Sequence, residues 1–162
     1  MESPFEVLAI KTGESILIYG IGNVGRQDDG LGHRMIENLE QKSLPKNWQL
    51  DANYQLNAEV SLQISGFDVI LFVDADKSSE SKGPFWIQPI VARAGQVEFS
   101  SHAMSAASVV ALCEELYHKK PRCYYLGIPG SEWEIGEGLG ELAEENLRNT
   151  QVAFEKFLET LA

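Results

Sequence analysis

Residues 16–33, ILIYGIGNVGRQDDGLGH, decide the fold of this chain. The apolar run at 16–19 is typical of a buried strand, and the glycines after it predict a sharp turn. Two adjacent carboxylates, Asp28 and Asp29, come next, and from Gly30 onward the apolar residues recur with a helical period. A strand, a glycine-rich turn and a helix in this order are typical of an α/β sheet, which binds its ligands at the carboxyl ends of its strands.

Two interpretations of this turn compete. Gly20, Gly22 and Gly25 match the dinucleotide-binding pattern G-x-G-x-x-G, and Asp51 then stands as a candidate for the ribose-binding acid. In a dinucleotide site, however, the helix starts within the glycine motif and its first amides hold the pyrophosphate. Here two carboxylates occupy the place of that anion, which favours a bound cation or simple capping of the helix. The nucleotide-binding domain is kept as the alternative.

Composition limits the partners of the chain. Its 162 residues are enough for one domain with a full core, and 44% of them are hydrophobic. The formal net charge of -11 repels nucleic acid and anionic membrane, so we expect neither as a partner, whereas a basic protein partner remains compatible. No signal peptide and no bilayer-spanning apolar run is evident, which predicts a cytoplasmic protein. Cys113 and Cys123 lack metal-site or redox spacing and are expected to be buried free thiols.

The rest of the chain alternates between strand and helix patterns. Strands are expected at about 48–51, 68–74, 85–90 and 124–128, and helices at about 30–42, 57–65, 103–119 and 139–161. The unbroken apolar run before Asp74 indicates a central parallel strand, and Pro89 indicates an edge strand. Ser101 is a candidate cap for the helix at 103–119, and residues 1–14 are expected to be loosely held. We predict that residues 1–162 form one α/β domain, a phosphorylase/hydrolase-like three-layer sandwich with a mostly parallel sheet and helices on both faces.

Three segments carry a family resemblance. The pattern GxGNxxxxDDGxG after an apolar strand is similar to the N-terminal signature of the [NiFe]-hydrogenase maturation endopeptidases. The later segments 73–75 (VDA), after an apolar strand, and 101–102 (SH), before a helix, follow in the order of that family. The chain departs from the family at 54–59, where a glycine-rich segment is often present, so no ligand contact is inferred for that segment.

Together the resemblance and the expected topology point to a metal-contacting set. Asp29, Asp74 and His102 are expected to meet at the carboxyl ends of the strands, and two carboxylates with one imidazole suit zinc or nickel. Taken singly, Asp74 is better explained as a residue that caps a turn, and His102 as an ordinary surface histidine. Their joint position at one end of the sheet, in the order of the family, favours the metal-contacting role. Asp76 is the main rival of Asp74, because only a residue that ends the strand is expected to point into the crevice, while Asp76 is expected to begin an exposed loop.

The resemblance also implies a reaction. Such enzymes remove the C-terminal extension of a hydrogenase large-subunit precursor after nickel insertion, and the nickel is held by the substrate's own cysteines. The implied cofactor is therefore nickel carried by the substrate, with no tightly held cofactor of the enzyme, and the implied chemistry is metal-assisted hydrolysis. Asn23 and Asp28 are candidate substrate or loop residues. The general base stays open: Asp28 is a candidate, although helix capping is its expected role. A non-catalytic metal-sensing chaperone of the precursor is a further alternative.

Overall fold

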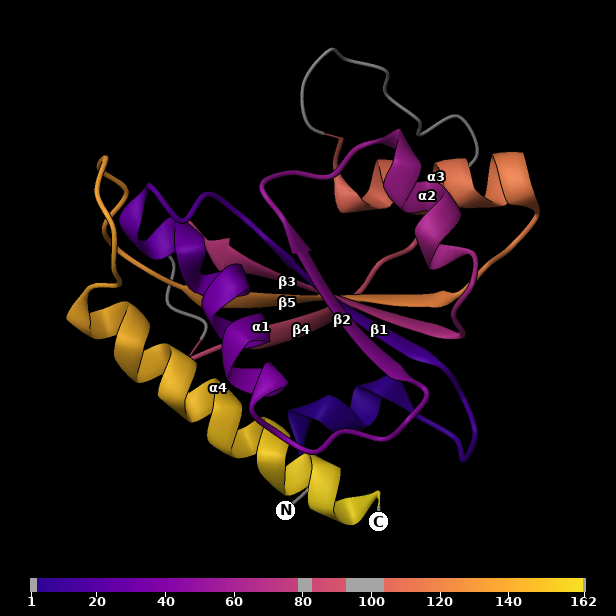
Figure 1. The fold of residues 1–162 in the computed structure, drawn as a ribbon, viewed down its shortest axis with the longest axis horizontal. Coiled ribbons are helices and arrows are strands. Elements are labelled where there is room, and N and C mark those ends of the chain that lie inside the picture. The colour runs from indigo at the N-terminus through magenta and orange to yellow at the C-terminus, as the bar shows by residue number, and fades with distance from the viewer. Residues whose placement is uncertain (1–2, 79–82, 93–103, 162) are drawn as a thin grey trace.

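A five-stranded sheet between two layers of helices forms the frame of the molecule (Figure 1). The computed structural model describes residues 3–78, 83–92 and 104–161. The strands are β1 (Ile16–Ile21), β2 (Trp48–Asn53), β3 (Val69–Asp76), β4 (Trp86–Pro89) and β5 (Arg122–Pro129). The helices are α1 (Leu31–Glu40), α2 (Ala58–Ile64), α3 (Ala106–Tyr117) and α4 (Glu141–Thr160), with 3-10 turns η1 (Pro4–Leu8) and η2 (Gln27–Gly30). The predicted α/β architecture is confirmed.

The central strand β3 shows why the sheet lies between two helix layers. Residues 69–73 are all fully buried, as the unbroken apolar run predicts. Because side chains alternate along a strand, Leu71 and Val73 pack with α1, α4 and η1 on one face, whereas Ile70 and Phe72 pack with α2 and α3 on the other. Figure 1 shows these two helix layers on opposite sides of the sheet.

The strand order β2-β1-β3-β5-β4 places a topological switch point between β1 and β3. The chain leaves β1 to form β2 on one side and then returns to form β3 on the other side of β1. Four strands of the sheet run parallel, namely β2, β1, β3 and β5. Strand β4 pairs antiparallel with β5 at the edge of the sheet, and this edge position is the one that Pro89 predicts. Ligands of open α/β sheets bind outside the carboxyl ends of the strands at such a switch point.

Two glycines bring α1 close to the sheet at this point. A Cβ atom on Gly20 would lie 2.5 Å from the carbonyl oxygen of Gly32, and a Cβ atom on Gly32 would lie 2.5 Å from the carbonyl oxygen of Val73. Both positions therefore require glycine for close packing of the helix on β1 and β3. This close crossing fixes η2, with its two aspartates, at the carboxyl edge of the sheet.

Two expected boundaries are wrong. Strand β3 continues through Asp76, because β5 extends to Pro129 and pairs with the last three residues of β3. Helix α3 begins at Ala106 rather than near 103, and its N-cap is Ser105, whose hydroxyl accepts a hydrogen bond from the Ser108 backbone N–H. Ser101, the expected cap, lies outside the described residues.

For residues 3–14, the prediction of a loosely held segment is also wrong. Phe5 is 0% exposed, and its ring contacts the rings of Phe85, Phe154 and Phe157. Arg122 on β5 donates hydrogen bonds of 3.1 Å to the carbonyl oxygens of Leu8 and Ala9. The segment completes the core between α4 and β4, which local sequence patterns do not reveal.

Glu14 and Arg122 form a two-pronged ion pair that makes stability depend on pH. Arg122 Nη1 and Nη2 lie 2.8 and 2.9 Å from the two carboxylate oxygens of Glu14. These hydrogen bonds lower the pKa of Glu14 from 4.5 to about 2. Because the folded-state pKa is depressed, the stabilisation is complete above the unfolded-state pKa and is lost as pH falls toward 2.

We expect Glu14→Gln to lower the free energy of unfolding by about 2 kcal/mol at neutral pH, the size typical of hydrogen bonds to charged groups. The difference from the parent should shrink between about pH 4.5 and pH 2, which urea unfolding at several pH values measures. Glu145→Gln, an exposed site on α4, serves as the control. A Glu14→Gln deficit that stays constant down to pH 2.5 would contradict this account.

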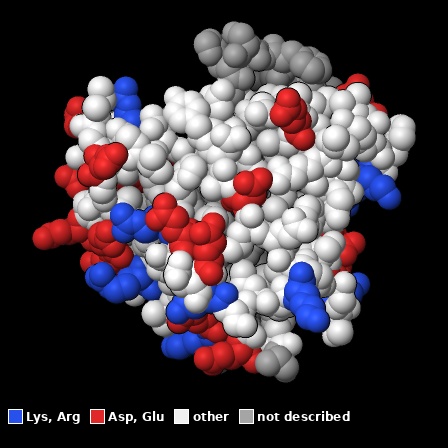
Figure 2. Space-filling view, in the orientation of Figure 1, with Lys and Arg blue, Asp and Glu red and all other residues white. Residues whose placement is uncertain are grey.

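Charged side chains link the two helices of one layer. On the face in Figure 2, acidic and basic side chains gather toward α4, while the centre of that face is mostly uncharged. Arg34 of α1 lies 3.1 Å from Glu144 of α4, and Lys42 lies 2.8 Å from Glu155.

Within the described residues, no helix combines the length and apolar character that a membrane span requires. Cys113 and Cys123 are buried free thiols, as predicted.

Candidate functional site

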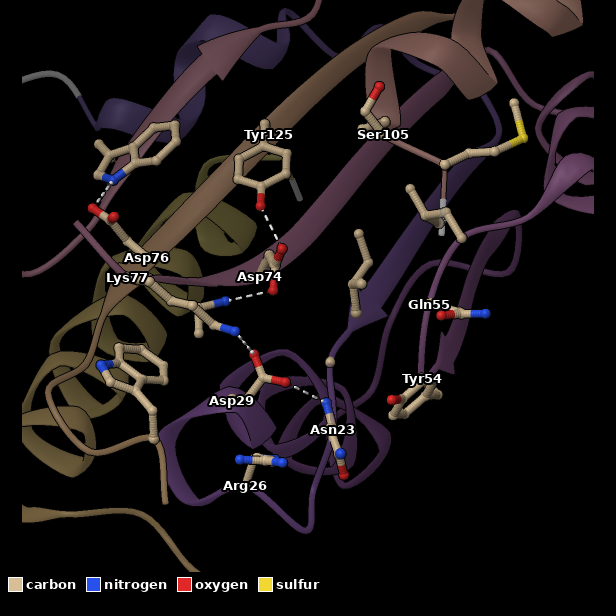
Figure 3. A pocket seen from close by; sticks show the side chains of 18 residues that line it. Asn23, Arg26, Asp29, Tyr54, Gln55, Asp74, Asp76, Lys77, Ser105 and Tyr125 are labelled. Atoms are coloured by element: carbon tan, nitrogen blue, oxygen red, sulfur yellow. Dashed lines mark hydrogen bonds and ion pairs between the residues drawn. The ribbon is translucent and has the colours of Figure 1, made fainter. Parts of the chain in front are cut away.

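A cleft of about 930 Å³ lies at the carboxyl ends of β1 and β3 (Figure 3). Its floor and walls come from the turn after β1, the segment at 54–56, the end of β3, the start of α3, and aromatic residues of β4, β5 and the loop before α4. The cleft therefore lies at the switch point of the sheet, and both Asp29 and Asp74 line it.

The turn after β1 directs the Asp29 carboxylate into this cleft. Asp29 Oδ2 accepts a 2.9 Å hydrogen bond from the backbone N–H of Asn23, and the Asn23 side chain accepts one of 2.8 Å from the Gly25 N–H. Gly22 has a φ of +140°, and a Cβ atom there would lie 2.0 Å from the Asp29 carbonyl oxygen. The motif glycines thus shape the turn around Asp29, and the loop candidate Asn23 lines the cleft.

Asp74 projects from β3 toward Tyr125 of the neighbouring strand. Its Oδ2 accepts a 2.5 Å hydrogen bond from the Tyr125 hydroxyl, and its Oδ1 accepts one of 2.8 Å from the Ala75 N–H. The pKa of Asp74 is raised from 3.8 to about 6, because burial and, to a smaller extent, the charge of Asp29 outweigh the opposing hydrogen bonds from Tyr125 and Ala75. Two carboxylates that line one cleft form a site suited to a cation.

Asp76 is not the start of an exposed loop, contrary to expectation. It is 8% exposed, ends β3 and shares a strand face with Asp74. Its carboxylate accepts 2.8 Å hydrogen bonds from the Trp86 indole and from the Ser78 N–H. Trp86 in turn stacks on Tyr125, with 5.5 Å between ring centroids. In Figure 3, Asp74 lies between Tyr125 and Asp29, whereas Asp76 lies to one side.

Asp28 neither caps helix α1 nor lines the cleft, the two positions that its expected roles require. The N-cap of α1 is Gly30, which makes no side-chain capping bond, and Asp28 is fully buried outside the cleft lining. Its carboxylate accepts 2.8 Å hydrogen bonds from three backbone N–H groups of one loop, those of Ser131, Glu132 and Gly140. Asp28 therefore anchors the loop that carries Trp133 to the cleft.

His102, the third predicted ligand, lies outside the described residues. Met104 and Ser105, the next residues that the structure describes, both line the cleft. Within the part of the chain that is described, no three His, Cys, Asp or Glu side chains form a metal-binding group. The other two histidines stay apart from the set: His33 Nε2 lies 3.1 Å from the Asn53 carbonyl oxygen, and His118 is exposed at the end of α3.

The nucleotide interpretation receives no support from this geometry. Helix α1 begins at Leu31, after η2, so its first amides do not lie within the glycine motif. Asp51 is outside the cleft lining and accepts hydrogen bonds from Gln63 and the Ala52 N–H. Helix α1 occupies the space beside Gly20 that a nucleotide would need. The Asp29 carboxylate lies where a pyrophosphate would have to bind.

Lys77, Tyr125 and Trp133 are among the cleft residues that the sequence did not point to. Lys77 follows β3 directly and reaches across the cleft, where its Nζ lies 3.3 Å from Asp29 Oδ1. The only sequence signal for Tyr125 is its place in the strand expected at 124–128. Trp133 carries no local signal, because its position depends on the buried contacts of Asp28 across more than 100 residues.

Comparison with known proteins adds a strong likeness in structure. No protein-family model and no curated protein sequence matches the chain. The [NiFe] hydrogenase maturation protease HycI from Thermococcus kodakarensis KOD1 superposes with a TM-score of 0.73 at 21% identity, over 94% of this chain and 98% of that one. The hydrogenase maturating endopeptidase HybD from E. coli superposes with a TM-score of 0.70 at 22% identity, over 91% of each chain. This chain therefore has the fold of the [NiFe]-hydrogenase maturation proteases.

Proposed function

We propose that this protein is an endopeptidase that removes the C-terminal extension of a [NiFe]-hydrogenase large-subunit precursor after nickel insertion. The observation that carries the proposal is the convergence of Asp29 and Asp74 in one cleft of a fold shared with solved maturation proteases. The N-terminal pattern that resembles this family supplies Asp29 and the turn that orients it.

The donors in the cleft suit a metal that arrives with the substrate. Carboxylate oxygens accept divalent ions, but without a thiolate they hold nickel loosely. Asp29 and Asp74, with His102 as the proposed third donor, would complete the coordination of a nickel ion held by the precursor's cysteines. Such an ion polarises a nearby carbonyl and favours hydrolysis of the peptide bond. The protein itself would carry no tightly bound metal, and a general base is not assigned.

A two-by-two experiment tests whether the metal belongs to the substrate. Nickel-loaded and unloaded precursors are incubated with enzyme that was either treated with a chelator, which is then removed, or left untreated. We expect a loss of mass at the C-terminus of the loaded precursor with both enzyme preparations, because the substrate supplies the ion. The unloaded precursor should stay intact even when the enzyme has been supplied with free nickel.

Each other result rejects part of the proposal. Cleavage of the unloaded precursor by metal-supplied enzyme would indicate an ordinary metalloprotease with its own metal. Stable binding of the loaded precursor without any loss of mass would indicate a metal-sensing chaperone. An intact precursor without detectable binding would reject the precursor as the partner.

A further inference from the structure

We propose that Lys77 is a tethered counter-cation that occupies Asp29 in the metal-free protein and competes with free metal ions for the cleft. The inference rests on the proposed function, because it concerns how the same cleft distinguishes free metal from metal carried by a precursor. It adds a residue that selects the source of the metal.

Lys77 contacts the Asp29 carboxylate oxygen that is not hydrogen-bonded to the turn after β1. Asp29 Oδ2 is held by the Asn23 N–H, whereas Oδ1 faces Lys77 Nζ at 3.3 Å. The Lys77 charge also lowers the pKa of Asp74, although burial outweighs this effect and the net shift is upward. Figure 3 shows the Lys77 side chain reaching the Asp29 carboxylate. A single cation thus acts on both proposed metal-contacting carboxylates.

The same geometry lets Lys77 leave easily. Its side chain is 61% exposed, while that of Asp29 is only 16% exposed, so the lysine and not the carboxylate is free to move. Lys77 Nζ lies 5.5 Å from the centre of the Trp133 ring, a distance at which a cation is attracted to an aromatic face. A displaced ammonium group therefore has both water and Trp133 as partners.

The positive charge of Lys77 makes it compete with a divalent ion for the Asp29 carboxylate. A divalent ion that binds Asp29 must break the Lys77 ion pair and then lie close to a positive charge, which repels it. Free nickel has only its contacts with the cleft to offset this cost. Nickel carried by a precursor arrives with the contacts of the whole docked protein, so the same cost is a small fraction of its binding free energy. Lys77 would therefore weaken the response to free metal more than the response to a loaded precursor.

The test compares Ni²⁺ binding by the free protein and by three lysine variants in titration calorimetry. Lys77→Met keeps the length of the side chain and removes its charge, so we expect about fivefold tighter Ni²⁺ binding than in the parent. Lys77→Arg keeps the charge and should bind like the parent. Lys46→Met, at an exposed site, is the matched control and should also bind like the parent. Raising the salt from about 0.05 M to about 0.5 M should narrow the gap between Lys77→Met and the parent.

Two carboxylate variants separate the failure of this inference from the failure of the proposed site. If Asp29→Asn and Asp74→Asn both bind Ni²⁺ as the parent does, the metal-contacting role of the cleft is wrong, and the role of Lys77 fails with it. If both weaken binding while Lys77→Met fails to strengthen it, the site stands and the competition by Lys77 is rejected. Thermal unfolding of each variant verifies that it is folded, which the exposure of Lys77 favours.

Discussion

Replacing Asp74 by asparagine is expected to lower kcat/KM for the nickel-loaded precursor by about 10³-fold or more. An amide keeps the shape of the side chain and still accepts a hydrogen bond from Tyr125, but it loses the charge that a metal-bound substrate requires. Metal assistance contributes several kcal/mol to the stabilisation of the transition state, and each 1.4 kcal/mol is tenfold in rate. The measurement is the rate of mass loss at the precursor C-terminus under single-turnover conditions.

Asp76→Asn is the matched control for this prediction. Its amide oxygen replaces the acceptor of the Trp86 indole, and the main loss is the hydrogen bond from the Ser78 N–H. We expect its rate to stay within about tenfold of the parent, because the Trp86 indole keeps its acceptor and Asp29 and Asp74 are unchanged. The opposite pattern, with Asp76→Asn inactive and Asp74→Asn active, would move the metal-contacting residue two positions along β3.

Replacing Phe5 by alanine is expected to lower the free energy of unfolding by about 3–5 kcal/mol. The side chain is fully buried and contacts three other aromatic rings, so its removal leaves a cavity that α4 and β4 cannot fill by small shifts. The loss is a large part of the ~5–15 kcal/mol that typically stabilises a domain. Urea unfolding followed by circular dichroism measures it.

Val7→Ala is the control in the same 3-10 turn. Val7 is 41% exposed, and its truncation should change the free energy of unfolding by no more than about 0.5 kcal/mol. A Phe5→Ala effect below about 1 kcal/mol would show that the N-terminal segment is not part of the cooperative core, as the sequence alone had suggested.

The sequence predicts the layers of the fold because they depend on local periodicity. The apolar run at 69–73 identifies the central strand, and the alternation of strands and helices identifies the parallel sheet. Element ends are less well predicted, since they depend on the partner strand. Strand β3 extends to Asp76 only because β5 continues beside it to Pro129.

The candidate site likewise contains residues that the sequence places correctly and residues that it does not. The motif around Asp29 and the strand that carries Asp74 can be placed from sequence, since parallel strands bring their carboxyl ends to one edge of the sheet. Asp28 could not be placed in this way. The sequence suggests that it caps the helix, yet its side chain is fully buried and holds the loop before α4.

The sequence by itself therefore determined the α/β layers and the turn that presents Asp29. Tertiary structure alone decided the burial of Phe5, the anchoring role of Asp28, and the meeting of Lys77 with Asp29 and Trp133. The physical reason is the range of the interactions. Periodicity and glycine geometry act within a few residues, whereas Asp28 meets its loop 103 to 112 positions away. Contacts of that range form only when the whole sheet is assembled, so no local pattern encodes them.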